Sequence, residues 1–401
     1  MASRVTGRVA AVTAAVAVAA LAIALALVAA GNSASPSATP ADPSSSPTTA
    51  GVHQQTHPVA AVKPKPLRPG ESRMALRMAT AYRPAAPNDV GTDDYRCFLL
   101  DPHLTQDRYL TGTFVKPDNA NVVHHVILFR VDPDQVAAAK QLDAKDPGEG
   151  WTCFGDSGLP NSNDLDNAPW LGAWAPGGQE SVDAPGYGVP LPAGSRIVMQ
   201  VHYNLLAGTG PDRSAALLRL APPSAHLTPI ETMLLPAPVE LPCRPGHTDN
   251  PLCDRTTSIA DVVKRFGLVG QTNNWLNVLC GEQRDTQITT CTRTIREPTT
   301  IRAVAGHMHL LGRSIKIQVD PGTPRARTIL DIPVWDFDNQ AARPIKPVSL
   351  QPGETVKVTC KHVQWLRDQL PAFHGQPDRY VVWGEGTTDE MCLGILAVTH
   401  P

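Results

Sequence analysis

The sequence predicts an all-β fold built from β-sandwiches or jelly rolls. From Arg73 onward, short runs rich in β-branched and aliphatic residues recur, and Pro, Gly, Asn and Asp separate them. The 39 prolines and 30 glycines stand in dispersed, turn-like positions, which fits short strands better than long helices. A length of 401 residues favours about two domains. The expected strands are TGTFVKP (111–117), VVHHVILFRV (122–131), SRIVMQVHYNLL (195–206), SIKIQV (314–319), TVKVTCKHV (355–363), RYVVWGEG (379–386) and MCLGILAV (391–398).

Two segments have a helical pattern, DPDQVAAAKQLDA (132–144) and TTSIADVVKRFG (256–267). Both are short, so we expect insertions on a β framework rather than a helical domain. A change of domain is expected within residues 221–229. The predicted domains therefore span residues 71–225 and 226–401.

Residues 1–31 are expected to be a targeting segment. Arg4 and Arg8 precede an apolar run over residues 9–30, which is longer than a usual signal-peptide core and long enough to span a bilayer. A cleaved signal peptide and an uncleaved membrane anchor both remain open, and either one places the rest of the chain outside the cytoplasm. Residues 32–70, rich in Pro, Ser, Thr and Ala, are expected to form a linker.

The cysteine count agrees with export. Eight widely spaced cysteines favour four disulfides in an oxidising compartment, although the count alone leaves their pairing open. The absence of any CxxC pair argues against a thiolate metal site. Lys and Arg (35) nearly balance Asp and Glu (37), and no block of like charge occurs, so no nucleic-acid partner is expected.

Two strand-like segments carry candidate metal ligands. His124 and His125 are adjacent, so both can reach one metal only where the strand twists or ends. The alternative is one inward-facing and one outward-facing histidine. On the later segment, Gln200, His202 and Asn204 share one face, which suggests a polar cleft rather than core.

Two further positions extend the set. In VAGHMHLLG, His307 and His309 would share a strand face while Met308 points away as a packing residue. Met391 begins an apolar run and becomes a candidate ligand only if histidines converge on it. The other histidines are expected to be solvated, surface or capping residues: His53, His57, His103, His226, His247, His362, His374 and His400.

If these side chains converge, five histidines and one thioether would bind metal without a carboxylate ligand. Imidazole suits copper and zinc, and a thioether favours Cu(I). Two copper ions would suit two-electron chemistry, because each supplies one electron.

Seven motifs, in order, resemble the copper type II, ascorbate-dependent monooxygenases, the family of peptidylglycine α-hydroxylating monooxygenase and dopamine β-monooxygenase. The resemblance runs from Tyr95 to the C-terminus and rests on YRCF, VVHHVILF, GWTCF, GAWAPG, MQVHYN, HMHLLGR and GTTDEMC. It implies two jelly-roll domains, each with one copper ion, facing each other across a solvent-filled cleft.

The resemblance also implies roles for individual residues. The electron-transfer copper would be held by His124, His125 and His202, and the oxygen-binding copper by His307, His309 and Met391. Ascorbate would be the reductant and dioxygen the co-substrate in hydroxylation of a C–H bond. Gln200 matches a glutamine that faces the cleft. Disulfides Cys97–Cys153 and Cys360–Cys392 match family bridges, while Cys243–Cys253 and Cys280–Cys291 are paired here from proximity alone.

Three positions depart from the peptide-hydroxylating member of the family. Ala305 replaces an arginine that helps to hold the substrate carboxylate, and Leu393 and Ile395 replace an asparagine and a tyrosine. We therefore expect a neutral or apolar small-molecule substrate, with aromatic amines as one class. Two other functions stay open: a non-catalytic copper-binding protein for storage, delivery or sensing, and a β-sandwich recognition module with incidental histidines.

Overall fold

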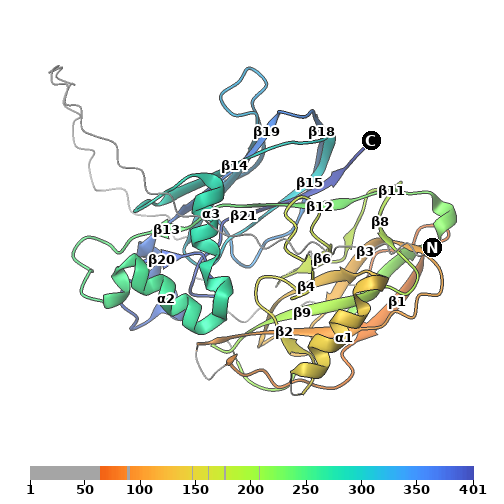
Figure 1. Ribbon diagram of the computed structural model, residues 1–401, viewed down its shortest axis with the longest axis horizontal. Coiled ribbons are helices and arrows are strands. Elements are labelled where there is room, and N and C mark those ends of the chain that lie inside the picture. The colour runs from red at the N-terminus through yellow and green to blue at the C-terminus, as the bar shows by residue number, and fades with distance from the viewer. Residues whose placement is uncertain (1–63, 88–90, 147, 161, 176–177, 207) are drawn as a thin grey trace, which may run out of the picture. The chain divides into compact units, whose positions relative to one another are not determined.

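The computed structural model describes residues 64–401 except 88–90, 147, 161, 176–177 and 207 (Figure 1). The predicted targeting segment, most of the predicted linker, and His53 and His57 lie outside the described residues. Within the described residues, two β-sandwiches follow one another along the chain.

The first sandwich consists of a six-stranded and a five-stranded sheet. The six-stranded sheet contains β1 (Ser72–Arg77), β10 (Ala215–Ala221), β3 (Arg108–Lys116), β8 (Tyr187–Leu191), β11 (Thr228–Pro229) and β7 (Ser181–Val182). The other contains β5 (Trp151–Thr152), β2 (Asp93–Leu100), β9 (Arg196–Asn204), β4 (Val123–Val131) and β6 (Trp170–Trp174). One apolar cluster joins the two sheets, with Leu110 and Leu218 from one packing with Phe98, Val126 and Met199 from the other.

The second sandwich pairs two four-stranded sheets. One contains β12 (Glu231–Pro236), β21 (Leu393–Thr399), β15 (Thr299–His307) and β18 (Arg343–Leu350). The other contains β14 (Ile288–Thr294), β19 (Thr355–His362), β16 (Gly312–Val319) and β17 (Arg327–Ile332). Its core joins Leu235, Ile301 and Leu396 to Ile315 and Val356 across the two sheets.

The predicted all-β fold is confirmed. The change from one sandwich to the other falls between β11, which pairs with β8, and β12, a few residues after the predicted division. The predicted strand at 379–386 is wrong for most of its length, because only β20 (Val381–Val382) forms there and pairs with β13 (Glu240–Leu241). Trp383 forms an isolated bridge to Glu390, and the rest of that segment is loop.

Helices occupy the connections between strands. Both predicted helices form, as α1 (Val136–Lys145) and α2 (Arg255–Phe266), and α3 (Thr272–Cys280) was not predicted. Short 3-10 helices are η2 (Pro133–Gln135), η3 (Pro223–Ala225), η4 (Pro251–Cys253), η5 (Gly267–Gln271), η6 (Gln364–Asp368) and η7 (Pro371–Phe373). No helix among the described residues is long and apolar enough to cross a membrane.

All eight cysteines form disulfides, and the four expected pairs are confirmed: Cys97–Cys153, Cys243–Cys253, Cys280–Cys291 and Cys360–Cys392. Cys360 lies on β19, and Cys392 immediately precedes β21 in the facing sheet, so this bridge fixes the start of β21. Four disulfides are typical of an oxidising compartment outside the cytoplasm.

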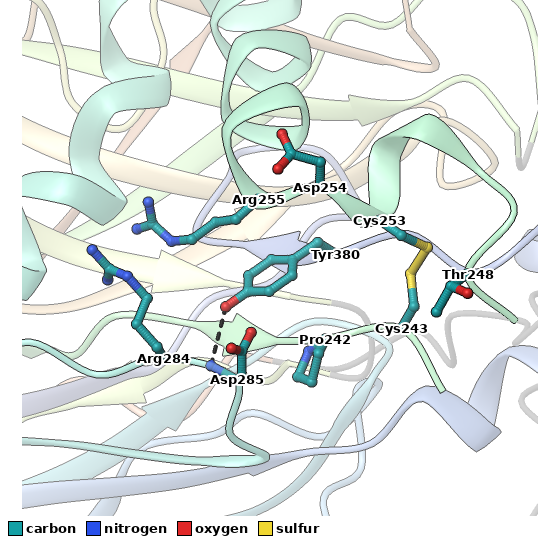
Figure 2. Close-up of a pocket in the computed structure, with 9 residues that line it drawn as sticks. All are labelled: Pro242, Cys243, Thr248, Cys253, Asp254, Arg255, Arg284, Asp285 and Tyr380. Carbon is teal, nitrogen blue, oxygen red and sulfur yellow. Dashed lines mark hydrogen bonds between the residues drawn. A yellow bond between two sulfur atoms is a disulfide. The ribbon is translucent and has the colours of Figure 1, made fainter. Parts of the chain in front are cut away.

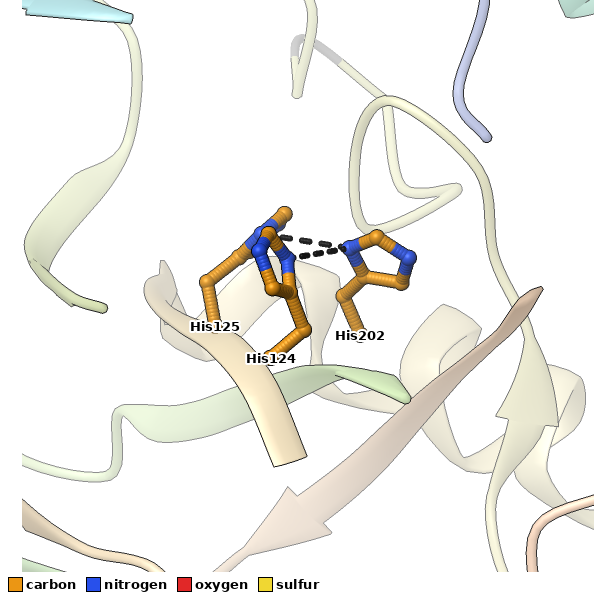
Figure 3. Close-up of side chains that lie close together, drawn as sticks. All are labelled: His124, His125 and His202. Atoms are coloured by element: carbon orange, nitrogen blue, oxygen red, sulfur yellow. Dashed lines mark hydrogen bonds between the residues drawn. The ribbon is translucent and has the colours of Figure 1, made fainter. Parts of the chain in front are cut away.

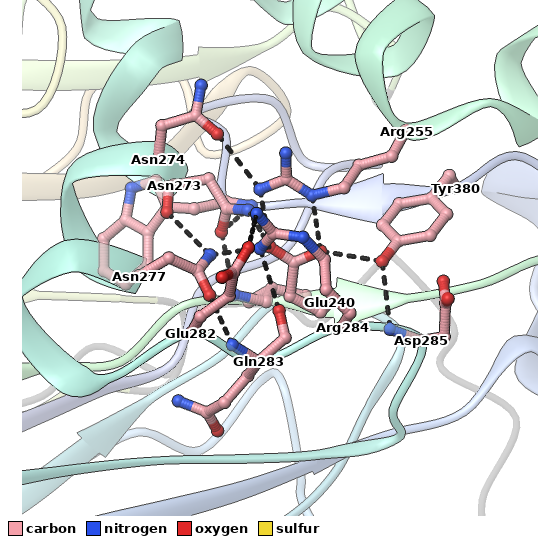
Figure 4. A network of polar contacts seen from close by, with 12 residues as sticks. Glu240, Arg255, Asn273, Asn274, Asn277, Glu282, Gln283, Arg284, Asp285 and Tyr380 are labelled. Carbon is pink, nitrogen blue, oxygen red and sulfur yellow. Dashed lines mark hydrogen bonds and ion pairs between the residues drawn. The ribbon is translucent and has the colours of Figure 1, made fainter. Parts of the chain in front are cut away.

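A buried carboxylate anchors the segment that carries α2 and α3 (Figure 4). Glu240 is fully buried on β13, and Arg255 donates to both of its carboxylate oxygens at 2.7 Å. Asn273, Asn277 and the Tyr380 hydroxyl donate to it at 2.8, 2.6 and 2.7 Å. Because these donors come from both helices and from the segment before β20, one carboxylate joins all three to β13.

We expect Glu240→Ala to lower the free energy of unfolding by about 3–5 kcal/mol, because it leaves the Arg255 charge and several buried donors without their partner. The control is Glu282→Ala, since Glu282 pairs with Arg284 but its side chain is 71% exposed. That change should cost less than about 1 kcal/mol. Urea unfolding monitored by circular dichroism measures both, and equal losses would contradict the central role of Glu240.

Candidate metal centre

Three histidines from two neighbouring strands converge (Figure 3). His124 and His125 lie at the start of β4, and His202 lies on β9. The register shifts between Val123, which pairs with Tyr203, and His125, which pairs with His202. His124 is the extra residue of this β-bulge, and a bulge re-aims side chains that would otherwise alternate. The local distortion that two adjacent ligands require is therefore present.

The ring nitrogens of these three residues form a nearly equilateral triangle. The His124 Nδ1 atom lies 3.2 Å from His125 Nδ1 and 3.1 Å from His202 Nδ1, and the third side is 3.2 Å. Each of the three nitrogens is either a donor or an acceptor, so at least two of them are of the same kind. Those two cannot hydrogen-bond to each other. Three nitrogens bound tetrahedrally at about 2.0 Å from a metal would lie about 3.3 Å apart. The triangle thus fits one metal ion better than it fits hydrogen bonding alone.

A carboxylate orients one of these imidazoles. His202 Nε2 donates to Asp93 Oδ1 at 2.8 Å, and both side chains are buried. The proton on Nε2 leaves the unshared electron pair on Nδ1, directed into the triangle. Burial acts to raise the pKa of Asp93, but hydrogen bonds from His202 and Thr387 outweigh it and lower that pKa.

The histidines are held in the neutral form that metal binding needs. Burial lowers the pKa of His124 and His125 well below the usual range, and neighbouring histidines add to the effect. Burial also lowers the pKa of His307 to about 3 and lowers that of His309. All four rings therefore carry an unshared electron pair near neutral pH.

The second group of predicted ligands lies at the end of β15. His307 is its last residue, and the His307 and His309 ring centroids are 5.2 Å apart. The β15–β21 ladder ends at the pair His307 and Leu393, and His309 and Met391 each lie two residues beyond it. Met308 is fully buried in the core, which confirms it as a packing residue.

A buried glutamate ties the segment around His309 to the one around Met391. The Glu390 carboxylate accepts the backbone N–H groups of His309 at 3.0 Å, of Met391 at 3.2 Å and of Leu311. His362 Nε2 lies 3.1 Å from the Met391 carbonyl oxygen and 3.3 Å from Glu390 Oε2. The prediction that His362 is a surface or capping residue is wrong, because the even-numbered residues of β19 face the core.

Hydrogen bonds indicate which nitrogen of each ring in the second group is available. His307 Nδ1 lies 2.6 Å from Gln340 Oε1, and His309 Nδ1 lies 3.3 Å from the Asp389 carbonyl oxygen. Since both oxygens are acceptors, each Nδ1 is the donor and each Nε2 holds the electron pair. His309 Nε2 is buried with no hydrogen-bond partner among the described residues.

The two groups of histidines touch. The His125 and His307 ring centroids are 5.9 Å apart, and His124 stacks on Phe337 with centroids 4.7 Å apart. The solvent-filled cleft that the family resemblance implies is therefore closed at this point. Phe337, from the loop between β17 and β18, contacts both groups, because its ring also lies edge-on to His309 with centroids 6.4 Å apart.

The two faces of β9 divide as the sequence predicts. Met199, Val201 and Tyr203 lie in the core of the first sandwich, and His202 lies on the opposite face. Gln200, which the family resemblance places at the cleft, is only 1% exposed and donates to the Asp156 carbonyl oxygen at 2.9 Å.

Contacts across the two sandwiches reach the first group directly, and these were not predicted from the sequence. The Tyr95 ring stacks on His202 at 4.0 Å, and its hydroxyl donates to the Glu385 carbonyl oxygen at 2.7 Å. The backbone N–H and hydroxyl of Thr387 donate to Asp93 Oδ1 at 3.1 and 2.6 Å. Because side chains alternate between the two faces of a strand, Asp93 is expected on the same face as Tyr95 of the YRCF motif.

A pocket of about 360 Å³ lies elsewhere, beside the Glu240 network (Figure 2). Arg255, Arg284, Asp254 and Asp285 line it, so its charges are mixed. Both arginines already pair with Glu240, and we assign no ligand to this pocket.

No protein-family model matches the chain, and no curated protein sequence is significantly similar to it. Among solved structures, the chain is similar to an allantoicase, with 12% identity over 70% of this chain and 76% of that chain and a TM-score of 0.18. It is also similar to a Paenibacillus xanthan lyase, with 12% identity over 85% of this chain and 26% of that chain and a TM-score of 0.19. A third similar structure is the coconut allergen cocosin, with 10% identity over 82% of this chain and 85% of that chain and a TM-score of 0.15. TM-scores this low carry no information about the fold or function of this chain.

Proposed function

We propose that this chain is an extracytoplasmic copper-dependent monooxygenase that hydroxylates a C–H bond with dioxygen and ascorbate or another one-electron donor. The observation that carries this proposal is the contact between two imidazole groups from different sandwiches. One group offers three Nδ1 atoms and the other offers two Nε2 atoms. In the second group, the Glu390 carboxylate accepts the backbone N–H groups of both His309 and Met391.

The donor atoms favour copper over the metals that need carboxylates. His124, His125 and His202 would hold one ion, and His307, His309 and Met391 the other. Imidazole suits both copper and zinc, but a thioether is a ligand for Cu(I). When bound, two copper ions supply the one-electron transfers and the dioxygen activation that hydroxylation requires.

The protein's own groups position these ligands. Asp93 fixes the ring orientation of His202, Gln340 fixes that of His307, and Glu390 holds the backbone around His309. Such supporting hydrogen bonds set which nitrogen faces the metal and how basic it is.

The surroundings of Met391 support a neutral or apolar substrate. Met391 packs with Leu234, Leu276, Trp383 and Leu393, all of them apolar. Ala305, where a carboxylate-binding arginine would stand, is 7% exposed. The apolar run at residues 9–30 would serve either as an export signal or as an anchor to the cell envelope.

Copper loading combined with an oxygen electrode tests the proposal. We expect two copper ions per chain and ascorbate-dependent oxygen uptake that is coupled to product when a neutral or aromatic amine substrate is present. His124→Ala should remove one ion and stop turnover. Stoichiometric copper binding without oxygen consumption across a broad substrate screen would instead favour a copper storage, delivery or sensing protein.

A further inference from the structure

Helix α3 has the reverse of the usual surface-helix pattern. Its buried residues are Asn273, Leu276 and Asn277. Its exposed residues include Trp275, Val278 and Leu279, which are 50%, 85% and 44% exposed. The last three are spaced i, i+3 and i+4, so they share one face. A helix on a water-facing surface normally points its polar residues outward.

The hydrogen bonds of the buried amides explain why polar residues lie on the inner face of α3, but not why apolar residues lie on its outer face. Asn273 and Asn277 face inward because they donate to the buried Glu240 carboxylate. Nothing in that network requires apolar residues on the outer face, because the outer positions make none of its hydrogen bonds. The outer face therefore needs a separate explanation.

The segment around α3 also lacks charge. No Asp, Glu, Lys or Arg occurs from Phe266 to Gly281. Leu268, on η5 within this segment, is 85% exposed. Lys264 is exposed at the end of α2, whereas Arg284, after α3, pairs with Glu282 and Glu240. An uncharged apolar surface that carries a tryptophan is typical of helices that lie in a membrane interface.

We propose that the α3 face, defined as Trp275, Val278 and Leu279, rests on a lipid bilayer. The helix lies on the membrane and does not span it, because its nine residues cover about 14 Å against the roughly 30 Å of a bilayer core. The proposal is independent of the copper chemistry.

The chain outside the described region argues for a bilayer rather than a second copy of the protein. The apolar run at residues 9–30 is long enough to insert in a membrane. Residues 31–63 connect it to the described region and can extend at most roughly 120 Å. A body held within that distance of a bilayer meets it far more often than it meets another soluble copy.

Tryptophan quenching in the full chain provides the test. Only Trp275 and Trp365 are substantially exposed among the seven tryptophans, and no tryptophan occurs in residues 1–63. With vesicles of brominated phosphatidylcholine and a minority of phosphatidylglycerol, we expect marked quenching. Trp275→Phe should remove the quenched component, whereas Trp365→Phe, on η6, should leave it unchanged.

A second variant tests the surface itself. Val278→Glu should abolish the quenching while leaving the thermal midpoint near that of the unaltered protein, because Val278 is 85% exposed. Equal quenching of the original chain and Trp275→Phe would overturn the proposal. So would a concentration-dependent dimer, lost in Val278→Glu, in a protein whose Trp275 is not quenched by lipid.

Discussion

Replacing Met391 by isoleucine is expected to abolish hydroxylation and to leave copper bound at His124, His125 and His202. Isoleucine has a similar volume and no sulfur, so it keeps the apolar packing at a cost below about 1.5 kcal/mol and removes only the thioether ligand. Oxygen uptake with ascorbate and substrate measures turnover. Paramagnetic resonance of the oxidised protein reports the copper that remains at the three-histidine group.

Met308 provides the matched control. It is a buried methionine one residue from each histidine of the second group, but it lies in the core and faces away from the ligands. Met308→Ile should reduce stability slightly and keep turnover. Full activity in Met391→Ile, or equal losses in the two variants, would show that Met391 is not a ligand.

The features that the sequence predicted depend on local pattern. Alternating runs identified most strands, and adjacent histidines required the twist that the bulge at His124 supplies. The strand predicted at 379–386 was too long. Its apolar residues continue to Trp383, but β20 ends after two residues.

Other features depend on partners distant in sequence, which local pattern does not contain. α3 was not predicted because its buried face is largely polar. Asn273 on that face donates to Glu240, a carboxylate 33 residues earlier in the chain. His362 was misjudged because its partners, Glu390 and Met391, lie just before β21, far along the chain. The contact between the two histidine groups likewise results from how the sandwiches pack.

Replacing Asp93 is the second change with a large expected effect. Asp93 joins a candidate ligand of the first sandwich to a loop of the second. Its Oδ1 atom accepts from His202 Nε2, from the Thr387 N–H and from the Thr387 hydroxyl. Asp93→Asn keeps the shape and removes the negative charge that makes the imidazole a stronger donor. We expect copper affinity at the three-histidine group to fall by about 10–100-fold, measured by competition with a Cu(I) chelator.

The neighbouring aspartate separates this effect from general destabilisation. Asp94 is equally buried but faces the other way, where it accepts from the Tyr82 hydroxyl at 2.8 Å and the Ala85 N–H at 3.0 Å. Asp94→Asn should lower stability and leave copper affinity unchanged. An unchanged affinity in Asp93→Asn would show that the carboxylate does not tune the ligand.

Thr387 shows whether the second sandwich takes part in that tuning. Thr387→Val keeps the side-chain shape and removes the hydroxyl donor to Asp93, whereas Thr387→Ser retains it. Without this donor, Asp93 interacts more strongly with the His202 N–H, so we expect the valine variant to shift the paramagnetic resonance spectrum of Cu(II) at the three-histidine group. The serine variant should match the original protein, and identical spectra for all three would confine the function of Thr387 to holding the sandwiches together.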